Sequence, residues 1–404
     1  MKELEKQLNS SHVFYITRDI ERAMALDLDT PGFFIISNYS DFAKRIAGDR
    51  KNILLIKAEH ILDTWELMQN PDIKLWLDRN NNSIKPFILV FKNTKQIEKI
   101  CEQNNWELLN PSAKLANQIE EKISQVQWLE ELKMFTPKYE IKNCMEIEWQ
   151  DKKFILQFNR SHTGSGTVLI ESEKQLGKIK EKFPLRQARM ADYIEGPLFT
   201  NNNIVWDNEI LQGNINYQIT GLAPFTDLPF AAVGNDWGIT DKILDQDQIK
   251  KYHEIVQAVG EKMKQAGWQG LFGVDIVLEE KTGMMYLLEI NARQPASTSY
   301  ESILQSNNPN GITVFQAHLA SLLKLKYQGE KPSKITDGAQ VIQRVTHKIS
   351  NISTENLQAL GLNLIPYNNI KSNSDLLRIQ SRTRIMQAHG QLGELGKKII
   401  YAIN

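Results

Sequence analysis

The residues near position 280 combine the kinds of side chain that metal and phosphate chemistry requires. The segment GVDIVLEE carries Asp275, and the segment MMYLLEINAR carries Glu289, Asn291 and Arg293. Both segments are typical of β-strands, and the residues 281–283, Lys-Thr-Gly, separate them. A three-residue connection that ends in glycine suits a type I turn closed by a residue in the left-handed conformation. The pattern therefore predicts a β-hairpin with its turn centred at position 282.

This predicted hairpin places two carboxylates side by side. With the turn so centred, Asp275 and Glu289 are direct cross-strand partners, which lie about 4.5–5.5 Å apart. Alternation along the strand puts Asn291 and Arg293 on the same face. The other face, which we expect to meet the core, is lined by Ile276, Leu278, Leu288 and Ile290. Two carboxylates this close repel each other, and a bound cation would remove that penalty.

The ligand types on this face suit Mg²⁺. This ion prefers oxygen ligands, and it commonly takes one or two carboxylates together with the phosphates of a nucleotide. Asp275, Glu289 and Asn291 offer such oxygens, and Arg293 adds a positive charge beside them. The alternative interpretation is a solvated hairpin face that carries charge but binds nothing.

Length and composition narrow the class of protein. The 404 residues allow two to four domains, and 48 basic residues balance 48 acidic ones. This balance gives no electrostatic reason to expect a nucleic acid or an anionic membrane as a partner. Two cysteines are too few for a disulfide framework, and the polar N-terminus lacks an apolar signal core. We therefore expect a cytoplasmic globular protein, most simply an enzyme.

The first 115 residues read as an open parallel sheet. Polar segments with helical patterns, such as 41–46 and 95–104, separate short apolar runs. The runs expected to form buried strands are Val13–Ile16, Phe33–Ile36, Ile53–Ile56 and Phe87–Phe91. Buried strands that alternate with helices are typical of parallel sheets covered on both faces.

The next stretch carries a possible phosphate-binding loop. One long helix is predicted over residues 115–133, and strands are expected at 148–158, 167–172 and 187–194. Between the first two strands lies the loop NRSHTGSGT, residues 159–167. Small residues let the backbone approach a ligand, and successive N–H groups can hold phosphate oxygens. Hairpin loops also carry such residues for purely conformational reasons, so this alternative stays open.

The remainder of the chain carries weaker signals. Residues 221–238 read as irregular, and they form either part of an acceptor pocket or an ordinary surface loop. Helices are expected at 247–266 and 311–325, and residues 337–404 suggest short strands without a chemical motif.

Four motifs together resemble those of the ATP-grasp superfamily: HTGSGT, ADYIEG, GVDIVLE and YLLEINARQP. The resemblance covers roughly residues 112–330, and the segment before it is similar to the pre-ATP-grasp domain. It implies an α/β (α+β) protein, with an ATP-grasp fold of two α+β subdomains preceded by an open parallel-sheet domain. The domains are then expected at 1–115, 116–190, 191–330 and 331–404.

The resemblance also implies ATP and Mg²⁺ (or Mn²⁺) as cofactors, with roles for individual residues. Asp275, Glu289 and Asn291 would hold the metal that bridges the β- and γ-phosphates. Arg293, with Asn291, would be catalytic, because the arginine would face the transferred phosphate and the nascent acyl phosphate.

Nucleotide-binding residues follow in the same way. Lys122 would contact phosphate, and the loop that closes over the triphosphate would comprise Thr163, Gly164, Ser165, Gly166 and Thr167. The segment Asp192, Tyr193 and Ile194 would hold adenine through backbone atoms. Gln157 is a departure, because the family usually has a second phosphate-binding lysine at this place.

These expectations predict an ADP-forming ligase. It would activate a small-molecule carboxylate as an acyl phosphate, which an amine or a thiol then attacks. The alternatives are a carboxylase-like enzyme that activates bicarbonate, a small-molecule kinase, and a non-catalytic nucleotide-binding regulator, for which Gln157 is the motive. A homodimer is a possible assembly.

Overall fold

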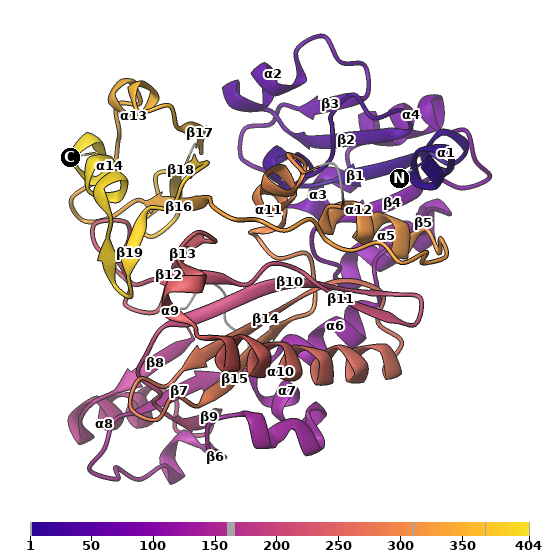
Figure 1. Ribbon diagram of the computed structural model, residues 1–404. Helices are drawn as coiled ribbons and strands as arrows, with labels where there is room; N and C mark the ends of the chain where they lie inside the picture. The colour runs from indigo at the N-terminus through magenta and orange to yellow at the C-terminus, as the bar shows by residue number, and fades with distance from the viewer. Residues whose placement is uncertain (1, 160–165, 309–310, 368, 404) are drawn as a thin grey trace.

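The N-terminal part of the chain is a parallel α/β layer. The structure is a computed structural model that describes residues 2–159, 166–308, 311–367 and 369–403 (Figure 1). Its first sheet has the order β3-β2-β1-β4-β5, and every neighbouring pair is parallel. The strands are β1 Val13–Ile16, β2 Phe33–Asn38, β3 Ile53–Ile56, β4 Phe87–Val90 and β5 Glu107–Leu108. The predicted parallel sheet is therefore confirmed.

Helices cover both faces of this parallel sheet, since side chains of β1 are buried in alternation in two separate hydrophobic clusters. The helices are α1 Lys2–Ser10, α2 Asp41–Ala47, α3 Thr64–Met68, α4 Pro71–Asn80 and α5 Lys95–Asn104, with a 3-10 turn, η1, at Ile20–Arg22. Local sequence sets their starts. The Ser40 hydroxyl accepts from the Ala43 N–H, and the Thr94 hydroxyl accepts from the Ile97 N–H.

The helix predicted over residues 115–133 is interrupted, so that prediction is wrong. Helix α6 (Ala113–Glu120) stops at Glu121, whose extended backbone has ψ 133°, and α7 (Lys122–Trp128) starts at the next residue. Side chains satisfy the backbone groups that the break frees. The Asn159 Oδ1 accepts from the Ile123 N–H at 2.9 Å, and the Gln125 amide donates to the Ile119 carbonyl at 2.8 Å. A 3-10 segment, η2 (Glu130–Phe135), follows.

A small antiparallel sheet comes next, in the order β6-β9-β7-β8, and we call it the small sheet. Its elements are β6 Tyr139–Asn143, η3 Cys144–Glu146, β7 Phe154–Phe158, β8 Thr167–Ile170, α8 Glu173–Lys182 and β9 Gln187–Asp192. One face packs against α8 through a cluster that includes Phe154, Leu156, Leu176 and Met190. Residues that alternate with these, such as Gln157, lie on the opposite face.

The large sheet carries the hairpin. Its order is β15-β14-β10-β12-β13-β16-β18-β17, with β11 paired to β10. The strands are β10 Leu198–Trp206, β11 Glu209–Gln212, β12 Asn216–Thr220, β13 Ala232–Asp236, β14 Gly270–Leu278, β15 Met285–Asn291, β16 Ala339–Arg344, β17 Asn363–Pro366 and β18 Asp375–Ser381. Strand β13 lies within the stretch expected to be irregular, so for residues 232–236 that expectation is wrong.

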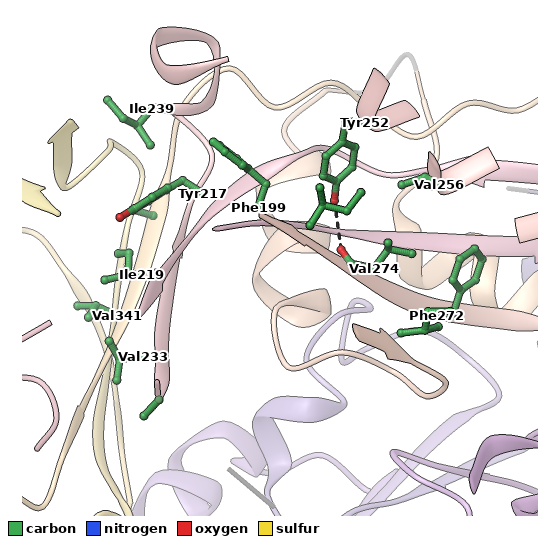
Figure 2. Close-up of a cluster of buried hydrophobic side chains, with 14 of the residues drawn as sticks. Phe199, Tyr217, Ile219, Val233, Ile239, Tyr252, Val256, Phe272, Val274 and Val341 are labelled. Atoms are coloured by element: carbon green, nitrogen blue, oxygen red, sulfur yellow. Dashed lines mark hydrogen bonds between the residues drawn. The ribbon is translucent and has the colours of Figure 1, made fainter. Parts of the chain in front are cut away.

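Helices cover this large sheet, and a small hairpin precedes the last helix. The helices are α9 Thr240–Ile243, α10 Gln246–Gln265, α11 Thr298–Gln305, α12 Val314–Leu322, α13 Glu355–Ala359 and α14 Glu394–Ile403. The strands of the small hairpin are β19 Met386–Ala388 and β20 Gln391–Leu392. Tyr252 of α10 packs over β10 and β14, and its hydroxyl donates to the Val274 carbonyl at 3.2 Å (Figure 2). Among the described residues, no helix is long and apolar enough to cross a membrane.

The predicted hairpin forms, with one change of register. Asp275 is paired with Glu289 as expected, but nearer the turn Leu278 is paired with Met285. The shift is a β-bulge at Leu288, and it turns Leu287 into the core in place of Leu288. The loop holds four residues, 280–283, and not three, because the Glu279 N–H bonds the Met284 carbonyl. Its last residue is a left-handed glycine at φ 71°, as predicted.

Candidate active site

The carboxylate pair lies on the face of β14–β15 opposite the core. Asp275 accepts hydrogen bonds from the Thr200 hydroxyl on β10 and, at 3.3 Å, from the Asn291 amide. Glu289 Oε2 lies 2.5 Å from the Lys122 Nζ, and 34% of the glutamate side chain remains exposed. The break before α7 makes Lys122 the first residue of that helix, which lets its ammonium meet the hairpin.

The two carboxylates differ in their proton affinity. Burial raises the pKa of Asp275 to about 6, and the charge of Glu289 adds to the rise. Burial alone would also raise the pKa of Glu289, but Lys122 and Arg293 hold that pKa below its ordinary value. Glu289 is therefore the permanent anion of the pair. A cation between the two would remove their repulsion and favour the ionised form of both, so the oxygen donors fit a magnesium ion.

Arg293 lies just beyond the end of β15, in a turn closed by its N–H on the Asn291 carbonyl. Its Nη1 donates to the Asn291 Oδ1 at 2.7 Å and lies 3.2 Å from a Glu120 oxygen. The second Glu120 oxygen lies 2.5 Å from the Lys92 Nζ. A chain of charges therefore runs from the parallel sheet through α6 to the hairpin. In this arrangement the amide oxygen of Asn291, which the sequence analysis assigned to the metal, accepts a hydrogen bond from Arg293.

Two further residues that the sequence predicts to bind nucleotide, Gln157 and Thr167, lie on the small sheet. The Gln157 amide donates to the Thr167 hydroxyl at 3.3 Å, and the Phe158 N–H bonds the Gly166 carbonyl at 3.0 Å. The other loop residues predicted to cover phosphates, Thr163, Gly164 and Ser165, lie outside the described residues.

The predicted adenine segment lies against the turn of the hairpin. Asp192 ends β9, and its side chain accepts a hydrogen bond from the Lys152 ammonium at 2.7 Å. Beyond Tyr193 and Ile194, the Glu280 N–H bonds the Glu195 carbonyl at 3.1 Å. At Gly196, φ is 151° and a Cβ would lie 2.0 Å from the Leu278 carbonyl oxygen. Only glycine permits this close approach.

The structure thus forms two bonded groups, Lys122–Glu289 and Asp275–Asn291–Arg293, which the cross-strand pairing of Asp275 with Glu289 sets side by side. Gln157 and Thr167 lie on the small sheet. No group of three or more His, Cys, Asp or Glu side chains within the described ranges could hold a metal. That finding suits an ion that takes its remaining ligands from a nucleotide and water.

Sequence reasoning missed several residues of this site. Lys92, Glu120 and Thr200 come from three different elements, and each reaches the hairpin only through long-range packing. Their sequence neighbourhoods carry no motif. Thr200 could have been found from strand pairing. A strand paired with β14 must place one residue beside Asp275, and in the register of β10 that residue is Thr200.

Residues 119–297 match a family model described as the ATP-grasp domain. Both the 159–167 loop and the β14–β15 hairpin fall within this matched segment, which is therefore similar to the ATP-grasp domain. A comparison with curated protein sequences gave no match.

Solved structures share this fold over nearly the whole chain. N5-carboxyaminoimidazole synthetase from Staphylococcus aureus, complexed with ADP, has a TM-score of 0.65 at 12% identity, covering 97% of this chain and 96% of that one. L-amino acid ligase from Bacillus licheniformis has 0.65 at 14%, with 97% and 96% covered. Biotin carboxylase from Campylobacter jejuni has 0.64 at 14%, with 94% and 89% covered. The predicted ATP-grasp fold after a parallel-sheet domain is confirmed.

Proposed function

We propose that this protein is an ADP-forming ligase that activates a small-molecule carboxylate as an acyl phosphate for attack by an amine. The observation that carries the proposal is the arrangement, side by side on the β14–β15 hairpin, of the Lys122–Glu289 ion pair and the hydrogen-bonded chain Asp275–Asn291–Arg293. It sets paired carboxylates between a lysine and an arginine, in a segment similar to the ATP-grasp domain. Such a set can bind a metal nucleotide and also neutralise the charge that develops during phosphoryl transfer.

The residues divide the work as follows. Magnesium, when held by Asp275 and Glu289, would neutralise phosphate charge. Lys122 would contact a phosphate oxygen, and backbone atoms of Asp192 and Ile194 would hold adenine. The loop from Thr163 to Thr167 would exclude water from the reacting groups.

Arg293 would hold two anions that otherwise repel each other, the γ-phosphate and the substrate carboxylate. A carboxylate oxygen attacks the γ-phosphorus, the bond to the β–γ bridging oxygen breaks, and ADP leaves. The amine nitrogen then attacks the acyl carbon and loses a proton, while the C–O bond to phosphate breaks and releases inorganic phosphate. Preorganised positive charge of this kind stabilises such transition states.

Incubation with ATP, Mg²⁺ and pools of amino acids, followed by phosphate and nucleotide analysis, tests the proposal. We expect ADP, phosphate and an amide in equal amounts. ADP with a stable phosphorylated product would identify a kinase, and AMP would identify an adenylating enzyme. Nucleotide binding without any turnover would instead support the non-catalytic regulator.

A carboxylase-type reaction, in which bicarbonate is the carboxylate, is the second candidate. It is favoured by the likeness to a biotin carboxylase and to an N5-carboxyaminoimidazole synthetase. ADP release that depends on bicarbonate, with no other carboxylate present, would favour the carboxylase-type reaction over amino-acid ligation.

A further inference from the structure

Arg189 is a buried cation on the face of the small sheet opposite α8. It lies in β9, where its neighbours Ala188 and Met190 point into the α8 core, so its own side chain points the other way. In the register of the sheet, Arg189 is the direct partner of Gln157 on β7. The two side chains therefore share one face of the sheet. On this face Gln157 donates to Thr167, the last residue of the 159–167 loop.

The guanidinium has few partners for so deep a position. Arg189 is 2% exposed, and its Nε and Nη1 find no hydrogen-bond acceptor among the residues that the structure describes. Its central carbon lies 5.3 Å from the centre of the Tyr139 ring. Burial lowers the pKa of Arg189 to about 10, a shift that Tyr139 and Glu289 oppose. A buried guanidinium with unused donors is costly unless an anion binds there.

The surroundings of Arg189 indicate which anion fits. The field of Glu289 reaches the guanidinium, so Arg189 lies on the side of the small sheet that faces the hairpin. Glu289 is already paired with Lys122, at the start of the helix that packs on β7 and β9. An anion beside the start of this helix, on the face of the small sheet that carries Gln157, would meet Lys122 and Arg189 together. Planar guanidinium donors suit phosphate oxygens especially well.

We propose that Arg189 binds a phosphate oxygen of the nucleotide, and that it supplies the positive charge which Gln157 does not. The proposal deepens the function proposed above and rests on it, since it assumes that ATP or ADP occupies this site. Arg189 would be a binding residue of the triphosphate. The competing explanation is a packing role, in which the guanidinium only covers the ring of Tyr139.

Moving the positive charge from position 189 to its cross-strand partner, position 157, distinguishes phosphate binding from a packing role. The variants are Arg189→Gln, Arg189→Lys and the double variant Arg189→Gln/Gln157→Lys. The matched control is Arg186→Gln, because Arg186 is exposed and covers Phe158 on the opposite face. The measurements are the Kd for ADP with Mg²⁺ by calorimetry and the melting temperature without nucleotide.

We expect Arg189→Gln to weaken ADP binding by about 10- to 100-fold, the range for losing a charged hydrogen bond. The double variant should regain most of that loss, and Arg189→Lys should remain within several-fold of the wild type. The control should bind as the wild type does. Arg189→Lys also serves if the neutral variant fails to fold.

A packing role predicts a different pattern. The melting temperature would fall in both Arg189 variants, ADP affinity per folded molecule would stay within about twofold, and the double variant would recover nothing. That result would overturn the assignment of Arg189 while wild-type ADP binding left the proposed function standing. A wild type that binds no ADP would overturn both.

Discussion

Lys122 and Glu289 form an ion pair of 2.5 Å that joins the first turn of α7 to the hairpin of the large sheet. The pair keeps Glu289 ionised in a largely buried place, and it holds the lysine beside the carboxylates. A lysine that serves a nucleotide must exchange this partner for a phosphate oxygen. The ion pair thus couples the carboxylate face of the hairpin to α7, the helix whose Ile123 N–H donates to Asn159 at the end of β7.

The first prediction concerns the carboxylate pair. Glu289→Gln removes one of the two oxygen anions proposed to hold magnesium, so ATP turnover should fall by at least about 10²-fold. The fold should persist, because the side-chain amide oxygen of glutamine can still accept a hydrogen bond from the Lys122 ammonium. Phosphate release measures the first effect, and the melting temperature measures the second. Glu280→Gln at the exposed turn is the control, and equal activity of both variants would remove the metal assignment.

The second prediction concerns Gln157 in the wild-type background. Gln157→Lys places a second cation directly across from Arg189, and like charges opposite each other destabilise a sheet by up to about 1 kcal/mol. Without nucleotide, the melting temperature should fall by a few degrees. With ADP and Mg²⁺ it should rise more than in the wild type, because phosphate would then lie between the two cations. Equal nucleotide-induced shifts in both proteins would contradict a phosphate-facing position for residue 157.

The third prediction concerns Glu301, which is completely buried on α11. The carboxylate accepts from the Asn214 N–H at 3.0 Å and from the Asn202 amide. Burial raises its pKa to about 7, against an ordinary value of 4.5. The folded protein therefore keeps this proton over a range in which the unfolded chain has lost it. The free energy of unfolding should consequently fall as the pH rises from about 4.5 to 7.

Glu301→Gln removes the titrating group and should flatten this slope. Denaturant unfolding at pH 5 and pH 7.5 should show the wild type losing up to about 3 kcal/mol more than the variant. Other buried acids, such as Asp236, titrate in both proteins and cancel in the comparison. Glu59→Gln, at an exposed loop, should retain the wild-type slope. Parallel curves for wild type and Glu301→Gln would show that Glu301 is ionised across this range.

Local patterns were sufficient to predict four strands of the parallel sheet and the central carboxylate pair. The buried runs of the parallel sheet contain no competing signal, and turn chemistry placed Asp275 opposite Glu289. The same reasoning failed by one residue nearer the turn, because the sequence LLEI gives equal apolar character to Leu287 and Leu288. Which of them enters the core is decided by the bulge and by packing against α10, neither of which is visible in a short pattern.

Helix α6–α7 shows a second limit. The apolar spacing continues through Glu121, so periodicity predicts one helix, yet the chain breaks there. The compensating partner of the Ile123 N–H is Asn159, which is remote in sequence. The sequence pattern does not identify Arg189 as a binding residue, for a related reason. In a strand it reads as an ordinary charged residue, and only the register with Gln157 and the depth of burial distinguish it.

The last prediction is that the reaction passes through an acyl phosphate that depends on Arg293. Removing this side chain should not unfold the protein, because Glu120 keeps its ion pair with Lys92. Arg293→Ala should therefore lose about 10²–10³-fold in turnover, while its Kd for ADP changes far less. Arg79→Ala on the exposed face of α4 should match the wild type in both measurements.

The fate of oxygen tests the intermediate itself. If the γ-phosphorus is attacked by a substrate carboxylate labelled with ¹⁸O, one labelled oxygen remains in the C–O–P bridge. Attack of the amine on the acyl carbon breaks the C–O bond, so that label must leave with inorganic phosphate. Mass spectrometry of the phosphate should find one ¹⁸O per turnover in the wild type, and the same ratio in the slow Arg293→Ala reaction. Label found only in AMP would mean that the carboxylate attacks the α-phosphorus, and the acyl-phosphate mechanism would be wrong.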